Sequence, residues 1–284
     1  MIFNLICVRI AYRCTLYEQS YREPINLSND QASSSDYVQS LARGLLVLRT
    51  FSAEHPALTL AEASRLTGLT RATVRRSLHT LQKLGYVITD GKQFELTPRV
   101  LDIGYAYLAS AQIGEVAEPF MEALSDQLNE SVSVAVLDEF EIVYVARVPT
   151  KRIMRIGLAL GSRLPALVTS MGRMIVADLP PVEQSKFLKS APFPKMTEKT
   201  LNTKAELAKE IALIKQQGWA LLDQELEDGV RSIAAPIRDK HGRTIAAINI
   251  GTQTGRTKMS QLKDDYLPRL LQAANHITSA MAKR

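Results

Sequence analysis

The sequence predicts an α+β protein in two parts: a small helical part ending in a β-hairpin, and a larger part in which helices flank an antiparallel sheet. Three observations predict this. Apolar residues recur at helical spacing in short segments up to residue 83. The pair Asp90-Gly91 then separates two alternating runs. After residue 130 the apolar period changes to two, and strand-like runs alternate with helix-like ones.

The composition is that of an ordinary globular protein. The chain has 284 residues, of which 46% are hydrophobic and 23% charged, with a formal net charge of +6. Wholesale disorder is therefore excluded, and two domains are expected. The only two cysteines, Cys7 and Cys14, stand near the start, so the rest of the chain holds no disulfide, thiolate zinc site or cysteine nucleophile. No stretch approaches the ~20 apolar residues that span a bilayer, and a cytoplasmic protein is expected.

Residues 1–35 are expected to be a disordered leader. The apolar start is followed rather than preceded by its charges, unlike a signal peptide. The polar stretch Ser28–Asp36 is typical of a linker, and an upstream start codon chosen in error is the alternative origin of the segment. Four parts are predicted: the leader 1–35, the first domain 36–97, a connecting helix 98–111 and the second domain 112–284.

The first domain is predicted to begin with two helices. Asp36 is the expected cap of the first. Thr59 and Glu62 form a capping box for the second, and Gly68 stands where a left-handed C-cap is needed. The first helix is expected to bury an apolar stripe that consists of Val38, Leu41, Leu45 and Leu48.

A third helix, capped by Thr70, is predicted to carry a basic outer face. Its buried positions are Val74, Leu78 and Leu81. Two short helices around a glycine turn, the second one basic, constitute a helix-turn-helix whose second helix fits the major groove of DNA. The alternative is a solvated helix face that happens to be basic. The candidates for contact with double-stranded DNA are Thr70, Arg71, Ala72, Thr73, Arg75, Arg76 and His79.

A hairpin is predicted to follow the third helix. Tyr86–Thr89 and Lys92–Leu96 alternate around Asp90-Gly91, which makes this the winged form of the motif, with Lys92 at the tip to meet phosphate. Thr97 and Pro98 are then expected to cap and start another helix. That helix is a connector or a dimer contact, and its expected stripe is Leu101, Gly104, Tyr105 and Leu108.

The second domain is predicted to be an antiparallel sheet flanked by helices, an architecture of the sensor type. Alternation in the first strand places Val132, Val134 and Val136 on one face. Pro268 is expected to kink the last helix or to shift its start. Strands are expected at 131–137, 141–148, 153–158, 219–224, 231–238 and 244–251, and helices at 113–129, 170–179, 182–190, 204–217 and 260–282.

The residues of the second domain argue against catalysis. The histidines are widely spaced, without metal-ligand spacing. G-x-S-x-G, P-loop and G-x-G-x-x-G motifs are absent from the sequence. Neither an enzyme nor a cofactor or metal site is therefore expected. One acidic cluster is typical of a surface loop rather than of paired catalytic carboxylates: Asp223, Glu225, Glu227 and Asp228.

Three segments favour a small-molecule site instead. Residues 167–172 lead into a helix N-terminus, which favours anions. Ser232 and Asn249 each lie inside an apolar strand, where a polar residue is either a core residue with a satisfied partner or a ligand contact. A basic run nearby is either a solvated face or a partner for a carboxylate ligand: Arg147, Arg152, Arg155 and Arg163.

Six stretches carry a family resemblance, and Thr169–Arg173 and Asp223–Ala234 are among the most specific of them. On these stretches residues 38–282 resemble the IclR-type transcriptional regulators, and in particular the subgroup that controls protocatechuate and β-ketoadipate catabolism. The resemblance implies a winged helix-turn-helix, a linker helix and a GAF-like effector domain, in homodimers or homotetramers that dimerise through the DNA-binding domain and linker helix. The stretches that carry it are Ser40–Leu45, Leu84–Tyr86, Thr89–Gly91, Gly161–Ala166, Thr169–Arg173 and Asp223–Ala234.

The resemblance also implies site residues and partners. Ser40 and Arg43 join the candidates for DNA contact. The ligand is expected to be an aromatic or dicarboxylic acid that controls operator binding; RNA polymerase is a further candidate partner, activation and repression are both open, and a ligand-independent DNA-binding protein is the alternative. Ser232 stands where some members have cysteine, and the last strand also departs from the family, which leaves the ligand's identity open. Effector contacts are expected at Ser170, Met171, Gly172, Asp223, Ser232, Asn249 and Gly251.

Overall fold

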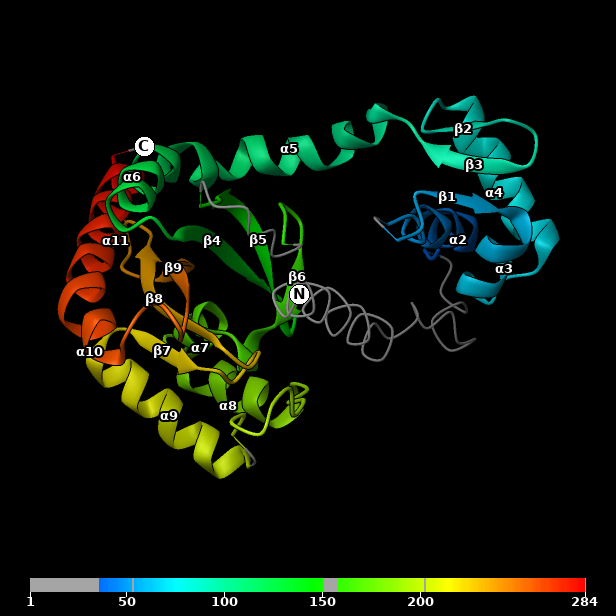
Figure 1. The fold of residues 1–284 in the computed structure, drawn as a ribbon. Helices are drawn as coiled ribbons and strands as arrows, with labels where there is room; N and C mark the ends of the chain where they lie inside the picture. The colour runs from blue at the N-terminus through cyan, green and yellow to red at the C-terminus, as the bar shows by residue number, and fades with distance from the viewer. Residues whose placement is uncertain (1–35, 53, 151–157, 202, 284) are drawn as a thin grey trace. The chain divides into compact units, whose positions relative to one another are not determined.

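The computed structural model describes residues 36–283 apart from 53, 151–157 and 202 (Figure 1). The expected leader 1–35, the residues Arg152 and Arg155, and most of the strand expected at 153–158 therefore lie outside the described residues. The described chain divides into two compact units, one ending at Ser110 and the other beginning at Ala111.

The first unit combines helices with a small antiparallel sheet, as expected for a winged helix-turn-helix. Val47, Leu58, Val74, Leu78 and Val87 form the centre of its core. The strands are ordered β1-β3-β2, and β1, only three residues long, was not predicted. The elements are α2 (Gln39–Leu48), β1 (Ala57–Thr59), α3 (Leu60–Thr67), α4 (Arg71–Lys83), β2 (Val87–Thr89) and β3 (Gln93–Leu96).

The caps of α3 and α4 are confirmed. The Thr59 hydroxyl accepts from the amide of Glu62, whose carboxylate accepts from the Thr59 amide in return, completing the capping box. Gly68 adopts the left-handed conformation, with φ of 68°. Thr70 caps α4 by accepting a hydrogen bond from the amide of Thr73. Local side-chain chemistry thus sets the turn between α3 and α4.

Two predictions for α2 are wrong. Val38 rather than Asp36 occupies the N-cap, without a side-chain cap hydrogen bond. The residue that enters the core is Val47, whereas Leu41 and Leu45 are 62% and 45% exposed. The helix therefore turns a different face inward, because its leucine face borders a groove rather than the core.

The segment after the hairpin agrees with expectation in part. Thr97 occupies the N-cap position and Pro98 begins the next helix, as predicted, but the Thr97 hydroxyl donates to the carbonyl of Gly85 and makes no cap hydrogen bond. Pro98 begins a short 3-10 helix, η1 (Pro98–Val100), which leads into α5 (Leu101–Ala111). Residues 101–107 are all exposed, so the apolar stripe predicted for this helix is not a buried face within its unit.

The second unit contains a six-stranded antiparallel sheet with helices on both faces (Figure 1). The strand order is β6-β5-β4-β9-β8-β7. Helices α6 (Ile113–Leu128) and α11 (Leu267–Ala282) cover one face, and α7 (Ser170–Ala177) covers the other, beside α8 (Pro181–Ser190) and α9 (Lys204–Gln217). The strands are β4 (Ser131–Asp138), β5 (Glu141–Val148), β6 (Arg163–Pro165), β7 (Ala220–Asp223), β8 (Val230–Arg238) and β9 (Thr244–Gln253).

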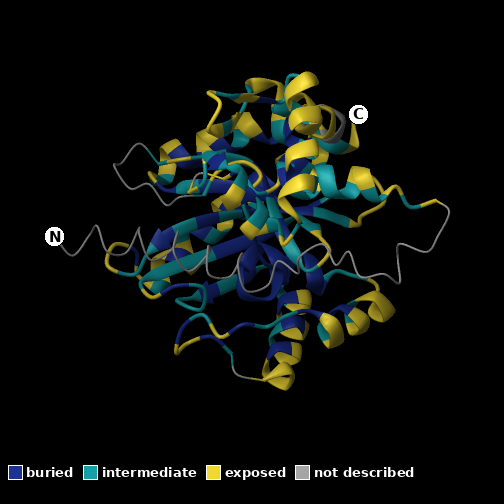
Figure 2. Ribbon diagram, turned by 90° about the vertical axis from the view of Figure 1, so that its right-hand side faces the viewer, coloured by how far each residue is buried: buried dark blue, intermediate teal, exposed yellow. Residues whose placement is uncertain are grey.

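Both faces of this sheet are buried, and strand β4 shows it. Val132 and Val134 lie in one core cluster and Val136 packs against it, as their alternation predicted, while Ser133 and Ala135 are buried as well. The strands near the centre of Figure 2 are accordingly dark blue or teal, which marks them as buried or partly buried. Strand β6 was not predicted, and it follows the stretch outside the described residues in which another strand was expected. Pro268 lies in the first turn of α11, after a π-helical stretch, η3 (Leu262–Tyr266), which confirms that it shifts the start of the helix.

Candidate functional site

The predicted DNA contacts fall into two groups on the first unit. The first group is exposed and lies on α4, at its N-cap and at the tip of the wing. It consists of Thr70, Arg71, Ala72, Arg75, His79 and Lys92. The turn that carries Lys92 is fixed by Asp90, whose carboxylate accepts from the amides of Lys92 and Gln93 and whose pKa is lowered by these bonds. The other group lines a groove between α2 and α4: Ser40, Arg43, Thr73 and Arg76.

This groove is largely apolar. Leu41, Leu45 and Leu48 of α2 lie along it, and Leu84 and Ile103 also line it. Within it the Nε atom of Arg43 is buried and has no hydrogen-bond partner among the described residues. Sequence reasoning missed the groove because it assigned the α2 leucines to the core.

The second unit holds a cavity between its sheet and the start of α7. Five of the predicted effector contacts line it: Ser170, Met171, Ser232, Asn249 and Gly251. Its empty volume, with the mouth included, is about 730 Å³. Small-molecule sites are typically concave and mostly apolar with a few placed polar groups, and this cavity also takes in Tyr144, Leu164 and Leu222.

The floor of the cavity is built by strand register. Ser133 on β4 lies opposite Arg147 on β5 and opposite Asn249 on β9. Residues directly opposite one another share a face of the sheet, so the three form one polar row. Gly251 opens space in the row beside it, because it brings no side chain. That second row consists of Ser131, Gly251 and Ser232.

The wall of the cavity is the N-terminus of α7. Thr169 caps the helix by accepting from the amide of Gly172 at 3.1 Å. Ser170 is only 1% exposed, and its Oγ atom has no hydrogen-bond partner among the described residues. A helix N-terminus leaves amides unbonded and carries a partial positive charge. This wall therefore suits an anionic or hydrogen-bonding ligand.

Gly172 and Asp223, two further expected effector contacts, lie outside the described lining of the cavity. A Cβ at Gly172 would overlap the backbone of Ala166, so the glycine permits the close packing of α7. Asp223 makes an ion pair with Arg231 at 2.6 Å. Burial raises the pKa of Asp223, but the hydrogen bonds from Arg231 and Gln224 and the charges of Arg231 and Lys199 together outweigh it, and the pKa lies below its ordinary value.

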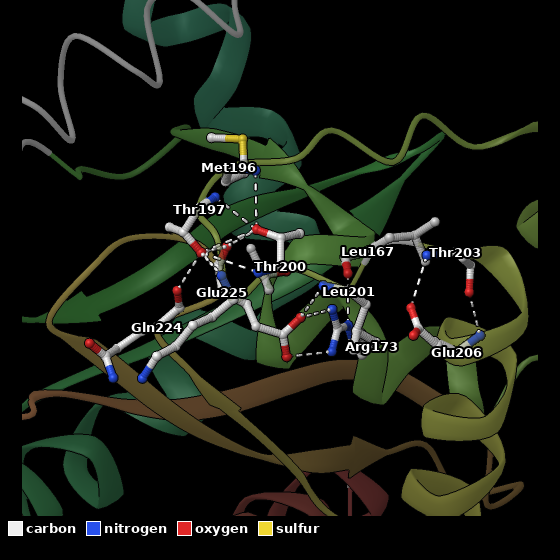
Figure 3. A network of polar contacts seen from close by, with 12 residues as sticks. Leu167, Arg173, Met196, Thr197, Thr200, Leu201, Thr203, Glu206, Gln224 and Glu225 are labelled. Atoms are coloured by element: carbon white, nitrogen blue, oxygen red, sulfur yellow. Dashed lines mark hydrogen bonds and ion pairs between the residues drawn. The ribbon is translucent and has the colours of Figure 1, made fainter.

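A buried ion pair joins α7 to the acidic cluster (Figure 3). Arg173 is fully buried, donates to the carbonyl of Leu167 at 2.7 Å and binds both carboxylate oxygens of Glu225. Thr200 donates to the Glu225 carbonyl at 2.7 Å, so Glu225 ties the cavity wall to a neighbouring loop. The surface-loop prediction is therefore wrong for Glu225 and also for Glu227, which is 8% exposed.

The basic run does not form one face. Arg147 lines the cavity, where burial lowers its pKa and its Nη1 atom donates to Ser133 Oγ at 3.3 Å. Arg163 pairs with Glu141 and Asp138 instead; burial lowers its pKa, but these two partners raise it by more. Arg163 is therefore bound within the protein, and the interpretation of Arg147 as a partner for a carboxylate ligand stays a prediction.

Two features are absent from the part of the chain that the structure describes. No group of three or more His, Cys, Asp or Glu residues there is arranged to hold a metal ion. No described helix is both long and apolar enough to cross a membrane.

A winged helix-turn-helix joined to a unit with a cavity that combines apolar and polar side chains defines a class, the two-domain DNA-binding regulators. The chain belongs to the IclR family of bacterial transcriptional regulators: the IclR helix-turn-helix domain matches residues 40–91, and the bacterial transcriptional regulator IclR C-terminal domain matches residues 105–279.

Individual relatives agree with this assignment. The Pca regulon regulatory protein of Pseudomonas putida is 42% identical over 243 residues, which cover 85% of this chain and 84% of the relative. A transcriptional regulator from Rhodococcus sp. RHA1 is 48% identical, with a TM-score of 0.79 over 87% of this chain and 99% of that one. The inducer-binding domain of Acinetobacter PobR, a double mutant in complex with 3-hydroxybenzoic acid, is 33% identical, with a TM-score of 0.55 over 58% of this chain and 97% of that one.

Proposed function

We propose that this protein regulates genes of aromatic-compound catabolism and that a small organic acid in the second unit controls its binding to operator DNA. The observation that carries the proposal is the buried hydroxyl of Ser170, which has no hydrogen-bond partner in the described part of the chain and lines a cavity at a helix N-terminus. Two relatives support the proposal. One is named as the Pca regulon regulatory protein, and the other is an inducer-binding domain in complex with a hydroxybenzoic acid.

The effector is proposed to be an aromatic or dicarboxylic acid such as protocatechuate or β-ketoadipate. A carboxylate suits both the helix N-terminus and the guanidinium of Arg147. Gly172 and Asp223 support the site from outside the lining, the first by close packing and the second by holding Arg231. The direct contacts are proposed to be Ser170, Met171, Ser232, Asn249 and Gly251.

DNA is proposed to bind along the exposed face of α4. The N-terminal residues of a recognition helix reach base edges in the major groove, which gives this role to Arg71, Ala72 and Arg75. Arginine pairs bidentately with guanine. Lys92 in the turn between β2 and β3 is placed to contact phosphate, which makes part of the affinity dependent on salt.

The active form is proposed to be a homodimer built through the first unit, either alone or within a tetramer. The groove of α2 and α4 is bordered by exposed Leu41 and Leu45, and the exposed face of α5 contains Ile103, Tyr105 and Tyr107. A second copy of this chain would remove these apolar side chains from water. Two copies would also present two recognition helices to two half-sites. Ser40, Arg43, Thr73 and Arg76 then belong to the dimer groove rather than to the DNA face.

Control of DNA binding is proposed to be a coupling between two sites. Domains at 36–97 and 112–284 are joined by residues 98–111, which include α5. An acid that binds one arrangement of the dimer more tightly shifts the population toward it. A change in the spacing of the two recognition helices then changes operator affinity.

A gel shift on the DNA upstream of the protein's own gene tests this function. The titration is run at fixed salt with protocatechuate, β-ketoadipate, 4-hydroxybenzoate or no acid. A shift whose midpoint moves with one acid is expected. A shift indifferent to every acid would replace the proposal by ligand-independent DNA binding, and chemical conversion of the recovered acid would point to an enzyme.

A further inference from the structure

Arg147 presents a guanidinium to the cavity without a carboxylate partner among the described residues. Its one polar side-chain contact there is the donation from Nη1 to Ser133 Oγ at 3.3 Å. The side chain is partly buried, and this burial lowers its pKa. A buried charge without a partner is costly, so the position favours a ligand that supplies the opposite charge.

Arg147 differs in this respect from its counterparts. Each of the other arginines described in the second unit has a carboxylate within hydrogen-bonding distance, on its own element or on a neighbouring one. They are Arg163, Arg173, Arg231, Arg238, Arg243, Arg256 and Arg269. The fold therefore pairs its arginines as a rule, and the exception is the one in the cavity wall.

The two glutamates that line the cavity already have interactions of their own. Glu225 binds Arg173 through both oxygens. Glu227 is buried and engaged in a polar interaction of its own. The residues aligned with Arg147 across the sheet, Ser133 and Asn249, are neutral, so they add hydrogen-bonding capacity without neutralising the guanidinium.

We propose that Arg147 determines the specificity of the site by binding the effector's carboxylate, which selects acids over uncharged analogues. This rests on the proposed function. A planar guanidinium binds a carboxylate through two parallel hydrogen bonds. Asn249 lies in the same row and would contact the ring or chain of the ligand. Ser170 at the start of α7 then takes a second polar group of the effector. The preferred ligand is an acid that carries a hydroxyl, keto or second carboxyl group away from the first carboxylate.

The test is isothermal titration of the full chain with 3,4-dihydroxybenzoate and with its uncharged isostere 3,4-dihydroxybenzamide. The Arg147→Met variant is expected to bind the acid roughly 10- to 100-fold more weakly, the range of a charge-assisted hydrogen bond, and the amide within about threefold of the wild type. Arg147→Lys keeps the charge but cannot form the two parallel hydrogen bonds. Its affinity for the acid is expected to lie between that of the wild type and that of Arg147→Met.

Arg163→Met is the matched control, because it removes an arginine of the same basic run that is already paired with Glu141 and Asp138. It is expected to leave the acid-to-amide ratio unchanged. Wild-type affinity for the acid in Arg147→Met, or equal weakening of acid and amide, would overturn the specificity role alone. A wild-type chain that binds neither 3,4-dihydroxybenzoate, 4-hydroxybenzoate nor β-ketoadipate would overturn the proposed effector site as well. If Arg147→Met does not fold, as judged by circular dichroism, the acid-to-amide ratio of Arg147→Lys decides, and an unchanged ratio refutes the role.

Discussion

Removing the Ser170 hydroxyl is expected to stabilise the ligand-free protein and to weaken effector binding. The Oγ atom is buried without a hydrogen-bond partner among the described residues, and an unsatisfied buried polar group costs about 1–3 kcal/mol. Ser170→Ala leaves a methyl group in the same place. The free energy of unfolding of the second unit is therefore expected to rise by about 1 kcal/mol, which corresponds to a Tm increase of roughly 2–4 °C.

The same substitution removes one hydrogen bond to the bound acid. A neutral hydrogen bond contributes about 0.5–1.5 kcal/mol, so the effector Kd is expected to rise roughly 2- to 13-fold. The assay is thermal unfolding of the full chain with and without 3,4-dihydroxybenzoate. In Ser170→Ala the ligand-free Tm rises while the ligand-induced increase in Tm becomes smaller.

Ser125→Ala is the matched control for this prediction. Ser125 is another buried serine of the second unit, but its Oγ donates to the carbonyl of Glu130 at 2.8 Å. Its removal is expected to lower the ligand-free Tm and to leave the effector Kd unchanged. A lower ligand-free Tm in Ser170→Ala, together with an unchanged Kd, would show that the hydroxyl has a structural partner and would refute the reasoning.

Three further predictions concern stability and assembly. Arg173→Met leaves Glu225 buried without its partner and should cost about 3–5 kcal/mol in urea unfolding; a loss below 1 kcal/mol would mean that the pair is solvated. Asp223→Asn should flatten the acid limb of the stability curve: the lowered pKa of Asp223 gives stability that is complete above its ordinary value of 3.8 and is lost as the pH falls through the folded-state pKa. Urea unfolding as a function of pH checks this, and an unchanged acid limb would mean that the pair of Asp223 with Arg231 does not stabilise the folded state. Leu45→Glu in the α2 groove should shift the protein toward the monomer in analytical ultracentrifugation and weaken operator binding; an unchanged dimer would contradict the proposed interface.

Local chemistry made the helix-turn-helix predictable from the sequence. The capping box at Thr59 and Glu62, the left-handed Gly68 and the cap at Thr70 each depend on residues within a few positions of one another. The hairpin at Asp90-Gly91 is equally local. Strands β1 and β6 were missed because three residues carry too little periodicity to indicate a strand.

Tertiary contacts set the limits of that prediction. The leucines of α2 have helical spacing, but spacing does not tell whether an apolar stripe faces the core or an intermolecular groove. The ion pair of Arg173 with Glu225 joins residues 52 positions apart, and no local sequence pattern indicates it. The resemblance to the IclR family pointed to the segments that line the cavity, whereas the distinction between Arg147 in the cavity and Arg163 in an ion pair required the structure.

The central claim is that separate residues of one chain bind DNA and effector and that the two sites are coupled. Fluorescence anisotropy of a labelled operator fragment, with and without saturating 3,4-dihydroxybenzoate, tests it directly in wild type, Arg75→Ala and Ser170→Ala. Arg75→Ala is expected to bind the operator more weakly while its effector Kd is unchanged, and Ser170→Ala is expected to bind the free operator normally while requiring more acid for the response. Equal loss of both functions in each folded variant would contradict the account.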